Sequence, residues 1–236
     1  FDFHSKGDIK EATKFYKYFI EQNYNDHRIF SNYASILKEI GKLEEAELYI
    51  RKAIDLEYSN AISHNNLGNI LRELGRLEEA EISLQKAINI NPNYEIAYLN
   101  LANVLIDIGK MKEAELSLRK AIHIKPNYSK AYLNLGSILK ANGKLKDAEI
   151  SFLKSIELEP KNKKTEANLI SLLSIYQPSN IDSNKLFSIN EEFKNIKLPS
   201  IRDNLINDDA VLNVYSEGLK IYKKYNLDLN TNLSQI

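Results

Sequence analysis

Apolar residues within residues 95–128 recur at the three- and four-residue spacing of amphipathic helices, in two blocks. The first block stops at Gly109, where a glycine can take the left-handed conformation that ends a helix. The second stops before Pro126, which cannot continue a helical hydrogen-bond ladder. The pattern predicts two antiparallel helices joined by a tight glycine turn. The helical positions are Ile96, Leu99, Leu101, Leu105 and Ile108, then Met111, Ala114, Leu118, Ala121 and Ile122.

The same pattern recurs when the stretch is shifted by 34 residues in either direction. Residues 95–128 match residues 61–94 at 18 of 34 positions, and weaker copies occupy residues 27–60 and 129–162. A period of this length is typical of a solenoid, in which one helix pair is stacked many times and each pair is covered by its neighbours.

The two ends of the chain depart from this period. Residues 1–26 predict a partial repeat that consists mainly of its second helix, and residues 163–176 predict a capping helix or degenerate repeat. Residues 177–236 predict a helical extension and linker, with short helices near 183–196 and 209–225. Because the sequence begins within a repeat and without an initiator methionine, we expect it to be a fragment of a longer protein.

Small residues recur as regularly as the large ones. Gly68 and Gly136 occupy equivalent positions in the first helix of their repeats, where Ala34 and Ala102 stand in the other copies. A larger side chain at a close helix contact would overpack it, at a cost of about 1–3 kcal/mol. We therefore expect the paired backbones to approach closely here. Alanines in the second helices follow the same period, at Ala46, Ala80, Ala114 and Ala148.

Glycines recur at the turn within each pair and prolines at the boundary between repeats, at Gly41, Gly75, Gly109 and Gly143 and at Pro92, Pro126 and Pro160. Together with the small residues, they resemble the pattern of the tetratricopeptide repeat over residues 1 to about 176. The position that opens the family's pattern with tryptophan is filled here by Phe30, His64, Tyr98 and Tyr132. The resemblance implies an all-α fold, a right-handed α-solenoid of stacked antiparallel helix pairs, with a concave groove lined by the first helix of each pair. The array is similar to the repeat regions of bacterial tetratricopeptide proteins and, more weakly, of O-linked N-acetylglucosamine transferase-like proteins.

Composition narrows the chemistry further. The 32 basic and 32 acidic residues cancel, so the overall charge favours neither nucleic acid nor an anionic membrane. The absence of cysteine removes disulfides and thiolate chemistry and fits a reducing compartment. No apolar run approaches the roughly 20 residues that span a bilayer, and no signal peptide opens the sequence. We expect a cytoplasmic protein with neither membrane nor nucleic-acid partners.

No residue pattern predicts catalysis. The four histidines lack the spacing of metal ligands, and the glycines are spaced by 34 residues rather than gathered in a phosphate-binding loop. We therefore expect no catalytic residue, no metal site and no cofactor in this fragment. This expectation does not extend to the full-length protein, in which a domain outside this fragment could carry catalysis.

One column of polar residues does suggest a binding site. Asparagine recurs every 34 residues on the second turn of each first helix, at Asn32, Asn66, Asn100, Asn134 and Asn168. A carboxamide both donates and accepts hydrogen bonds, so it can pair with the backbone of an extended peptide. This column resembles the asparagine ladder of O-linked N-acetylglucosamine transferases, which holds protein substrates by their backbones. Tandem duplication is the alternative explanation, because it copies a residue without selecting it for binding.

Further polar positions accompany the ladder in the implied groove. They are Asn69 and Asn103 one turn on, and the cations Lys38, Arg72, Lys130 and Lys140. Counting the groove columns gives six cations against three anions, which predicts a mildly basic groove and favours an acidic or extended polar peptide. Scattered cations without interleaved aromatic residues do not predict nucleic-acid binding.

Three hypotheses follow for the function. The first is a non-catalytic protein-interaction scaffold that binds an extended peptide or a helix of a protein partner in the groove. The second makes the chain the substrate-recruiting arm of a larger enzyme, such as a glycosyltransferase, whose catalytic domain lies outside this chain. The third is self-association through the truncated N-terminal repeat, at Phe1 to Phe19, whose apolar helix face would be uncovered.

Overall fold

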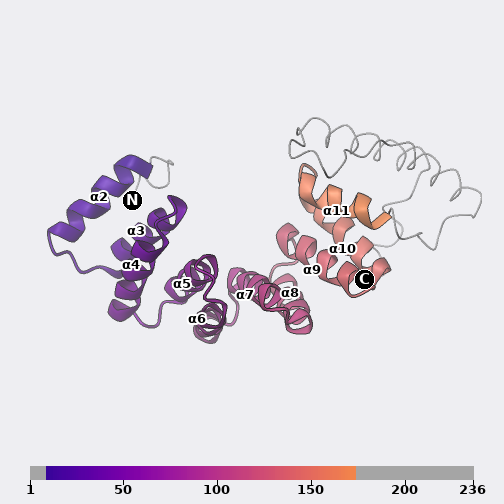
Figure 1. Cartoon of the computed structure of the whole chain (residues 1–236), viewed down its shortest axis with the longest axis horizontal. Helices are drawn as coiled ribbons and strands as arrows, with labels where there is room; N and C mark the ends of the chain where they lie inside the picture. Colours follow the sequence, from indigo (N-terminus) through magenta and orange to yellow (C-terminus); the bar gives the residue numbers. More distant parts are fainter. Residues whose placement is uncertain (1–8, 174–236) are drawn as a thin grey trace, which may run out of the picture. The chain divides into compact units, whose positions relative to one another are not determined.

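The computed structural model describes residues 9–173, which form ten α-helices and no strand (Figure 1). Residues 1–8 and the helices predicted near 183–196 and 209–225 lie outside the described residues and stay predictions. The helices are α2 (Ile9–Glu21), α3 (His27–Glu39), α4 (Leu43–Leu56), α5 (Ala61–Glu73), α6 (Leu77–Ile90), α7 (Glu95–Ile108), α8 (Met111–Ile124), α9 (Ser129–Ala141), α10 (Leu145–Leu158) and α11 (Lys163–Leu173).

The chain divides into two compact units, the first ending at Pro126 and the second beginning at Asn127. In the first unit, α3 packs on α4, α5 on α6 and α7 on α8, and successive pairs meet through α4 with α5 and α6 with α7. The first helices of successive pairs are also in contact, α3 with α5 and α5 with α7. In the second unit, α9 packs on α10, and α11 packs on both. The predicted all-α solenoid of stacked helix pairs is confirmed.

The turn within each pair has the predicted geometry. Gly109 has a φ of 88°, in the left-handed region, and its amide donates to the carbonyl of Ile106. The next amide, that of Lys110, donates back to the carbonyl of Leu105 at 2.8 Å. These bonds satisfy carbonyls that the end of α7 would otherwise leave unpaired. The helix therefore stops where the glycine stands.

Close helix packing accounts for the glycine inside α5. A Cβ atom added to Gly68 would lie 2.5 Å from Cγ of Leu84 on α6, which is shorter than a real carbon–carbon contact. Leu84 is fully buried, and so is Ala80 one turn before it. The predicted close approach of the two backbones is confirmed at this position.

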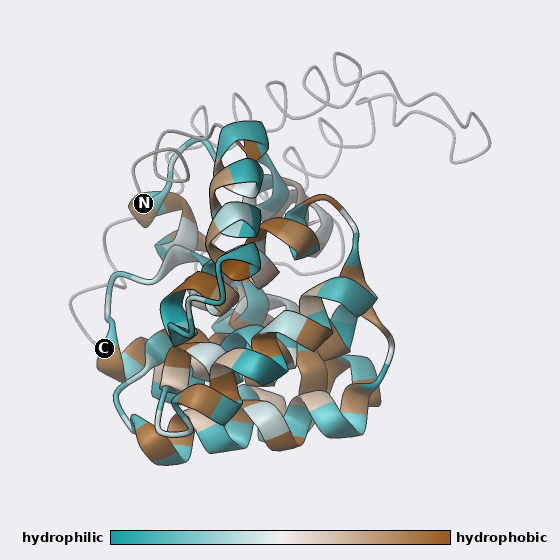
Figure 2. Cartoon of the chain, turned by 90° about the vertical axis from the view of Figure 1, so that its left-hand side faces the viewer, coloured by the Kyte–Doolittle hydropathy of each residue, from teal (hydrophilic) through white to brown (hydrophobic). Residues whose placement is uncertain are grey.

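Each helix is amphipathic, as the spacing of apolar residues predicts. Figure 2 shows hydrophobic and hydrophilic residues alternating along the helices, so that each carries an apolar and a polar side. Among residues 9–173, no helix combines the length and the apolar character needed to cross a bilayer.

Candidate functional site

The predicted ladder residues Asn32, Asn66 and Asn100 lie on α3, α5 and α7 of the first unit, and each is half-buried. Because α3 contacts α5 and α5 contacts α7, the three asparagines stand on neighbouring helices. We call this surface of the first unit the asparagine face. In the second unit, the half-buried Asn134 and Asn168 lie on α9 and α11, which are also in contact.

Hydrogen bonds connect the asparagine face from one repeat to the next. Asn100 Nδ2 donates to Oδ1 of Asn65 at 2.8 Å, which joins α7 to α5. Asn65 Nδ2 donates to Oδ1 of its neighbour Asn66 at 3.4 Å. Asn66 Nδ2 in turn donates to Oγ of Ser35 on α3, also at 3.4 Å. Two ladder residues, Asn66 and Asn100, therefore belong to one hydrogen-bonded network with Asn65 and Ser35.

Asn65 is a member of this network that the sequence did not single out as a binding residue. It is only 2% exposed, so it holds Asn100 from beneath the surface. The equivalent residues of the two following repeats are Leu99 and Leu133. An asparagine where the next copies carry leucine is the sequence signal for its role, because a buried carboxamide needs a hydrogen-bond partner.

The groove cations of the first unit are paired across repeats. Lys38 Nζ lies 3.1 Å from a carboxylate oxygen of Glu73 on α5. Arg72 Nε lies 2.6 Å from a carboxylate oxygen of Asp107 on α7. Both pairs are partly exposed, so each stabilises the fold by at most about 1 kcal/mol. Their charges nevertheless cancel locally, so the excess of cations counted along the sequence does not give an unpaired cationic surface at Lys38 or Arg72.

The remaining predicted site residues take separate positions. Asn69 and Asn103 are half-buried on α5 and α7, one turn beyond the ladder residues. In the second unit, Lys140 Nζ donates to Oγ of Ser171 at 2.7 Å, which connects α9 to α11. Lys130 is exposed at the start of α9.

A hollow of about 390 Å³ lies where the asparagine face begins. It is lined by His27, Arg28, Ser31, Asn32, Asn60 and Ile62. Arg28 forms a salt bridge of 2.6 Å with Asp26 beside it. The hydrogen bond from that guanidinium lowers the pKa of Asp26 to about 2, so the pair is ionised at neutral pH. The hollow brings Asn32 together with the first residues of two helices, α3 and α5.

Comparison with known proteins agrees with this architecture. A family model described as tetratricopeptide repeat matches residues 27–60, 96–128 and 129–162, and one described as TPR repeat matches residues 68–109. The structure of MamA is 27% identical over 69% of this chain and 95% of its own, with a TM-score of 0.60.

Two further structures show a similarity of fold. PilF of Pseudomonas aeruginosa is 18% identical, with a TM-score of 0.69 over 95% of this chain and 87% of its own. A tetratricopeptide protein of Thermus thermophilus, TTC0263, is 20% identical, with a TM-score of 0.61 over 73% of this chain and 94% of its own. No curated protein matches the chain. The repeat models and the stacked helix pairs together establish that the chain belongs to the tetratricopeptide repeat family.

Proposed function

We propose that the chain is a protein-interaction scaffold that binds an extended segment of a partner protein along the asparagine face. The observation that carries this proposal is that Asn32, Asn66 and Asn100 lie on α3, α5 and α7, each of which contacts the next. Packed helices lie about 8–10 Å apart. Three residues of an extended chain span roughly 10 Å, at about 3.3 Å per residue. An extended segment can therefore meet one asparagine every third residue.

The ladder network leaves hydrogen-bonding capacity for such a segment. A carboxamide has two N–H donors and an oxygen with two acceptor sites. Asn100 uses one donor on Asn65, and within residues 9–173 its oxygen accepts no hydrogen bond from the network. The bonds of Asn66 to Asn65 and Ser35 are both 3.4 Å long, so a shorter bond to a ligand could replace either of them.

The same network supports tight binding by holding side chains in place. Ordering a mobile side chain on binding costs about 0.5–1.5 kcal/mol. Asn100 is already held by a 2.8 Å bond to a buried partner, which reduces that cost. Because the nearby cations Lys38 and Arg72 are paired, the partner's backbone rather than its charge should supply most of the affinity.

The proposal can be tested with peptides selected on the protein from a library of random dodecapeptides. We expect Asn66→Ala with Asn100→Ala to weaken the binding of the selected peptides about fivefold or more, since two hydrogen bonds of about 0.5–1.5 kcal/mol each are lost. The matched control replaces two exposed asparagines of the first unit that are not ladder residues, Asn89→Ala with Asn93→Ala, and should leave affinity unchanged. Fluorescence anisotropy measures each dissociation constant.

Two results would decide against backbone recognition on this face. One is equal affinity of the double variant and the wild-type protein for every selected peptide. The other is tolerance of N-methylation at each peptide amide in turn, because methylation removes the backbone donor that a carboxamide oxygen would accept.

A further inference from the structure

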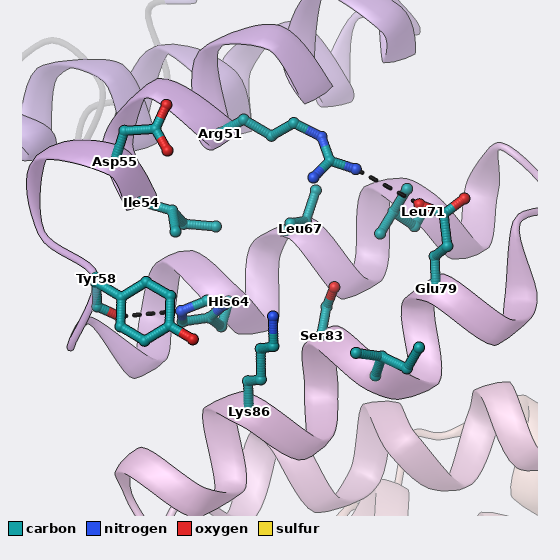
Figure 3. A pocket seen from close by; sticks show the side chains of 11 residues that line it. Arg51, Ile54, Asp55, Tyr58, His64, Leu67, Leu71, Glu79, Ser83 and Lys86 are labelled. Carbon is teal, nitrogen blue, oxygen red and sulfur yellow. Dashed lines mark hydrogen bonds and ion pairs between the residues drawn. The ribbon is translucent and has the colours of Figure 1, made fainter.

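A cavity of about 320 Å³ lies in the first unit, lined by residues of α4 and α6 and by one face of α5 (Figure 3). His64, Leu67 and Leu71 of α5 line it. At 100° per residue, these three share one face of α5, and Asn66 and Asn69 lie on the opposite face. The cavity is therefore separate from the asparagine face, and both surfaces can be occupied at once.

Comparison with the preceding repeat explains why this space is empty of side chains. There, the rings of Phe30 and Tyr49 stack with centroids 6.1 Å apart and planes 14° apart. The equivalent residues 34 positions later are His64 and Ser83, and both line the cavity. Replacing tyrosine by serine removes a whole aromatic ring from a site that interiors normally fill closely. The cavity thus has room for one ring.

The floor of the cavity is apolar and its opening is charged. Ile54, Leu67 and Leu71 are each at most 8% exposed. In Figure 3, the ammonium group of Lys86 and the hydroxyl of Ser83 both extend from α6 toward the cavity. Within residues 9–173, Lys86 forms no salt bridge, whereas the other cation at the rim, Arg51, lies 2.8 Å from Glu47.

His64 provides a neutral wall. Its Nε2 donates to the carbonyl of Tyr58 at 3.0 Å, and the Tyr58 ring lies edge-on to it at 5.3 Å. Burial lowers the pKa of His64, so the imidazole is uncharged at neutral pH. The remaining charged groups at the rim are Asp55 and Glu79, and Figure 3 shows Asp55 across the cavity from Lys86.

We propose that this cavity is a second docking site, which takes an aromatic side chain of a partner protein with a carboxylate adjacent to the ring. The missing ring volume at Ser83 and the apolar floor select the aromatic group. The ammonium of Lys86 lacks an ion-pair partner among the described residues and selects the carboxylate on the α6 side of the opening, away from the carboxylate of Asp55 across the cavity. Ile82 of α6, which lines the cavity and is 57% exposed, adds apolar contact surface at its opening.

The test uses N-acetyl-tyrosine, which carries both the ring and the carboxylate, and N-acetyl-tyrosinamide, which lacks the charge. Titration into the whole chain is followed by ¹H–¹⁵N NMR. We expect saturable shifts at the amides of Leu67, Ser83 and Lys86, with a dissociation constant on the order of millimolar for so small a ligand. N-acetyl-tyrosine should bind about two- to fivefold more tightly than the amide, the usual contribution of an exposed ion pair.

Two variants copy the aromatic residues that other repeats carry at these positions. Ser83→Tyr reproduces Tyr49, and His64→Tyr reproduces Tyr98, so each fills the space with a ring of the chain itself. Whichever of the two retains the wild-type circular dichroism spectrum should lose the saturable shifts. Lys86→Gln should remove the preference for N-acetyl-tyrosine, and the equivalent change one repeat later, Lys120→Gln, should leave it intact.

The proposal fails if the wild-type chain gives no saturable shifts at about 20 mM, well above the expected dissociation constant. It also fails if a folded, ring-filled variant binds as the wild type does. Equal binding of the acid and the amide would overturn the role of Lys86. None of these results bears on the asparagine face, whose own test uses variants of α5 and α7 on the opposite side.

Discussion

Replacing Asn65 by leucine should separate the stability of the fold from the function of the asparagine face. Asn65 is 2% exposed and accepts a 2.8 Å hydrogen bond from Asn100. Leu99 and Leu133 show that leucine occupies the equivalent position in two other repeats of this chain, where each is 6% exposed. The substitution is therefore compatible with the architecture.

The magnitudes favour a small change in stability. Loss of the 2.8 Å hydrogen bond from Asn100 costs about 0.5–1.5 kcal/mol, because Asn100 is half-buried and its freed N–H can still reach water. The bond from Asn65 to Asn66 is lost as well, but at 3.4 Å it contributes at the low end of that range. Burial of a leucine side chain contributes about 1.5–3 kcal/mol relative to leaving it exposed. The free energy of unfolding of Asn65→Leu should thus equal or exceed that of the wild type. Affinity for a selected peptide should fall about threefold or more, because Asn100 must then be ordered on binding.

A double-mutant cycle of Asn65→Leu and Asn100→Ala measures the coupling directly. Urea unfolding followed by circular dichroism should give a coupling of about 0.5–1.5 kcal/mol between the two sites. Peptide affinity should show the same non-additivity, since Asn65 acts through Asn100. Full peptide affinity in Asn65→Leu, or additive effects in both measurements, would refute the view that Asn65 positions Asn100.

Three further predictions concern the fold itself. Gly68→Ala should lower the free energy of unfolding by about 0–2 kcal/mol, as overpacking against Leu84 outweighs the helix-propensity gain of about 0.5–1 kcal/mol; a urea midpoint above that of wild type would contradict this. Gly109→Ala should cost about 1–2 kcal/mol for its left-handed φ alone, because an added Cβ meets nothing within 4 Å, and Gly109→Asn should cost less in the same assay. Burial raises the pKa of Glu166 from 4.5 to about 7. The protonated form is thus favoured in the folded state, so the free energy of unfolding should fall as pH rises from 4.5 to 7. Glu166→Gln should abolish this fall in the free energy of unfolding between pH 4.5 and 7. The same pH dependence in the variant and the wild type would show that Glu166 does not cause it.

The fold could be predicted because its determinants are local and are repeated. Gly109 fixes the end of α7 through its own backbone conformation, without help from distant residues. The role of Gly68 depends on a contact with Leu84 on the partner helix, so it is less local than that of Gly109. Both residues nevertheless lie within one 34-residue repeat. Repetition gave several copies of each signal, so single departures such as His64 did not obscure it.

The charge of the site could not be predicted by counting residues in columns. Lys38 and Glu73 are 35 residues apart and belong to different columns of different repeats. They meet because α3 and α5 are neighbouring helices, which brings Lys38 Nζ to 3.1 Å from the Glu73 carboxylate. Arg72 and Asp107 form the equivalent salt bridge one repeat later, between α5 and α7. Whether a groove cation is neutralised depends on which carboxylate faces it from the neighbouring helix. A sum of the charges along the groove does not show this pairing.

The cavity above α5 was missed for a related reason. His64 alone is a modest change from the aromatic residues of the other repeats, and Ser83 is shared in type with Ser117 and Ser151. Only the coincidence of the two in one repeat, next to a repeat that has Phe30 and Tyr49, leaves a ring-sized space. Packing volume depends on several positions at once.

Uniform and varied columns must contribute differently to binding in a repeat array. If every repeat offered the same asparagine to a backbone, a segment displaced by three residues would make the same hydrogen bonds, and the ladder alone could not fix its register. Register must then come from accessible positions where repeats differ, such as the half-buried Ile106 in place of the cations Lys38 and Arg72. Under the proposed function, the ladder supplies affinity for any extended chain, and these departures from the repeat decide which chain binds and where it stops.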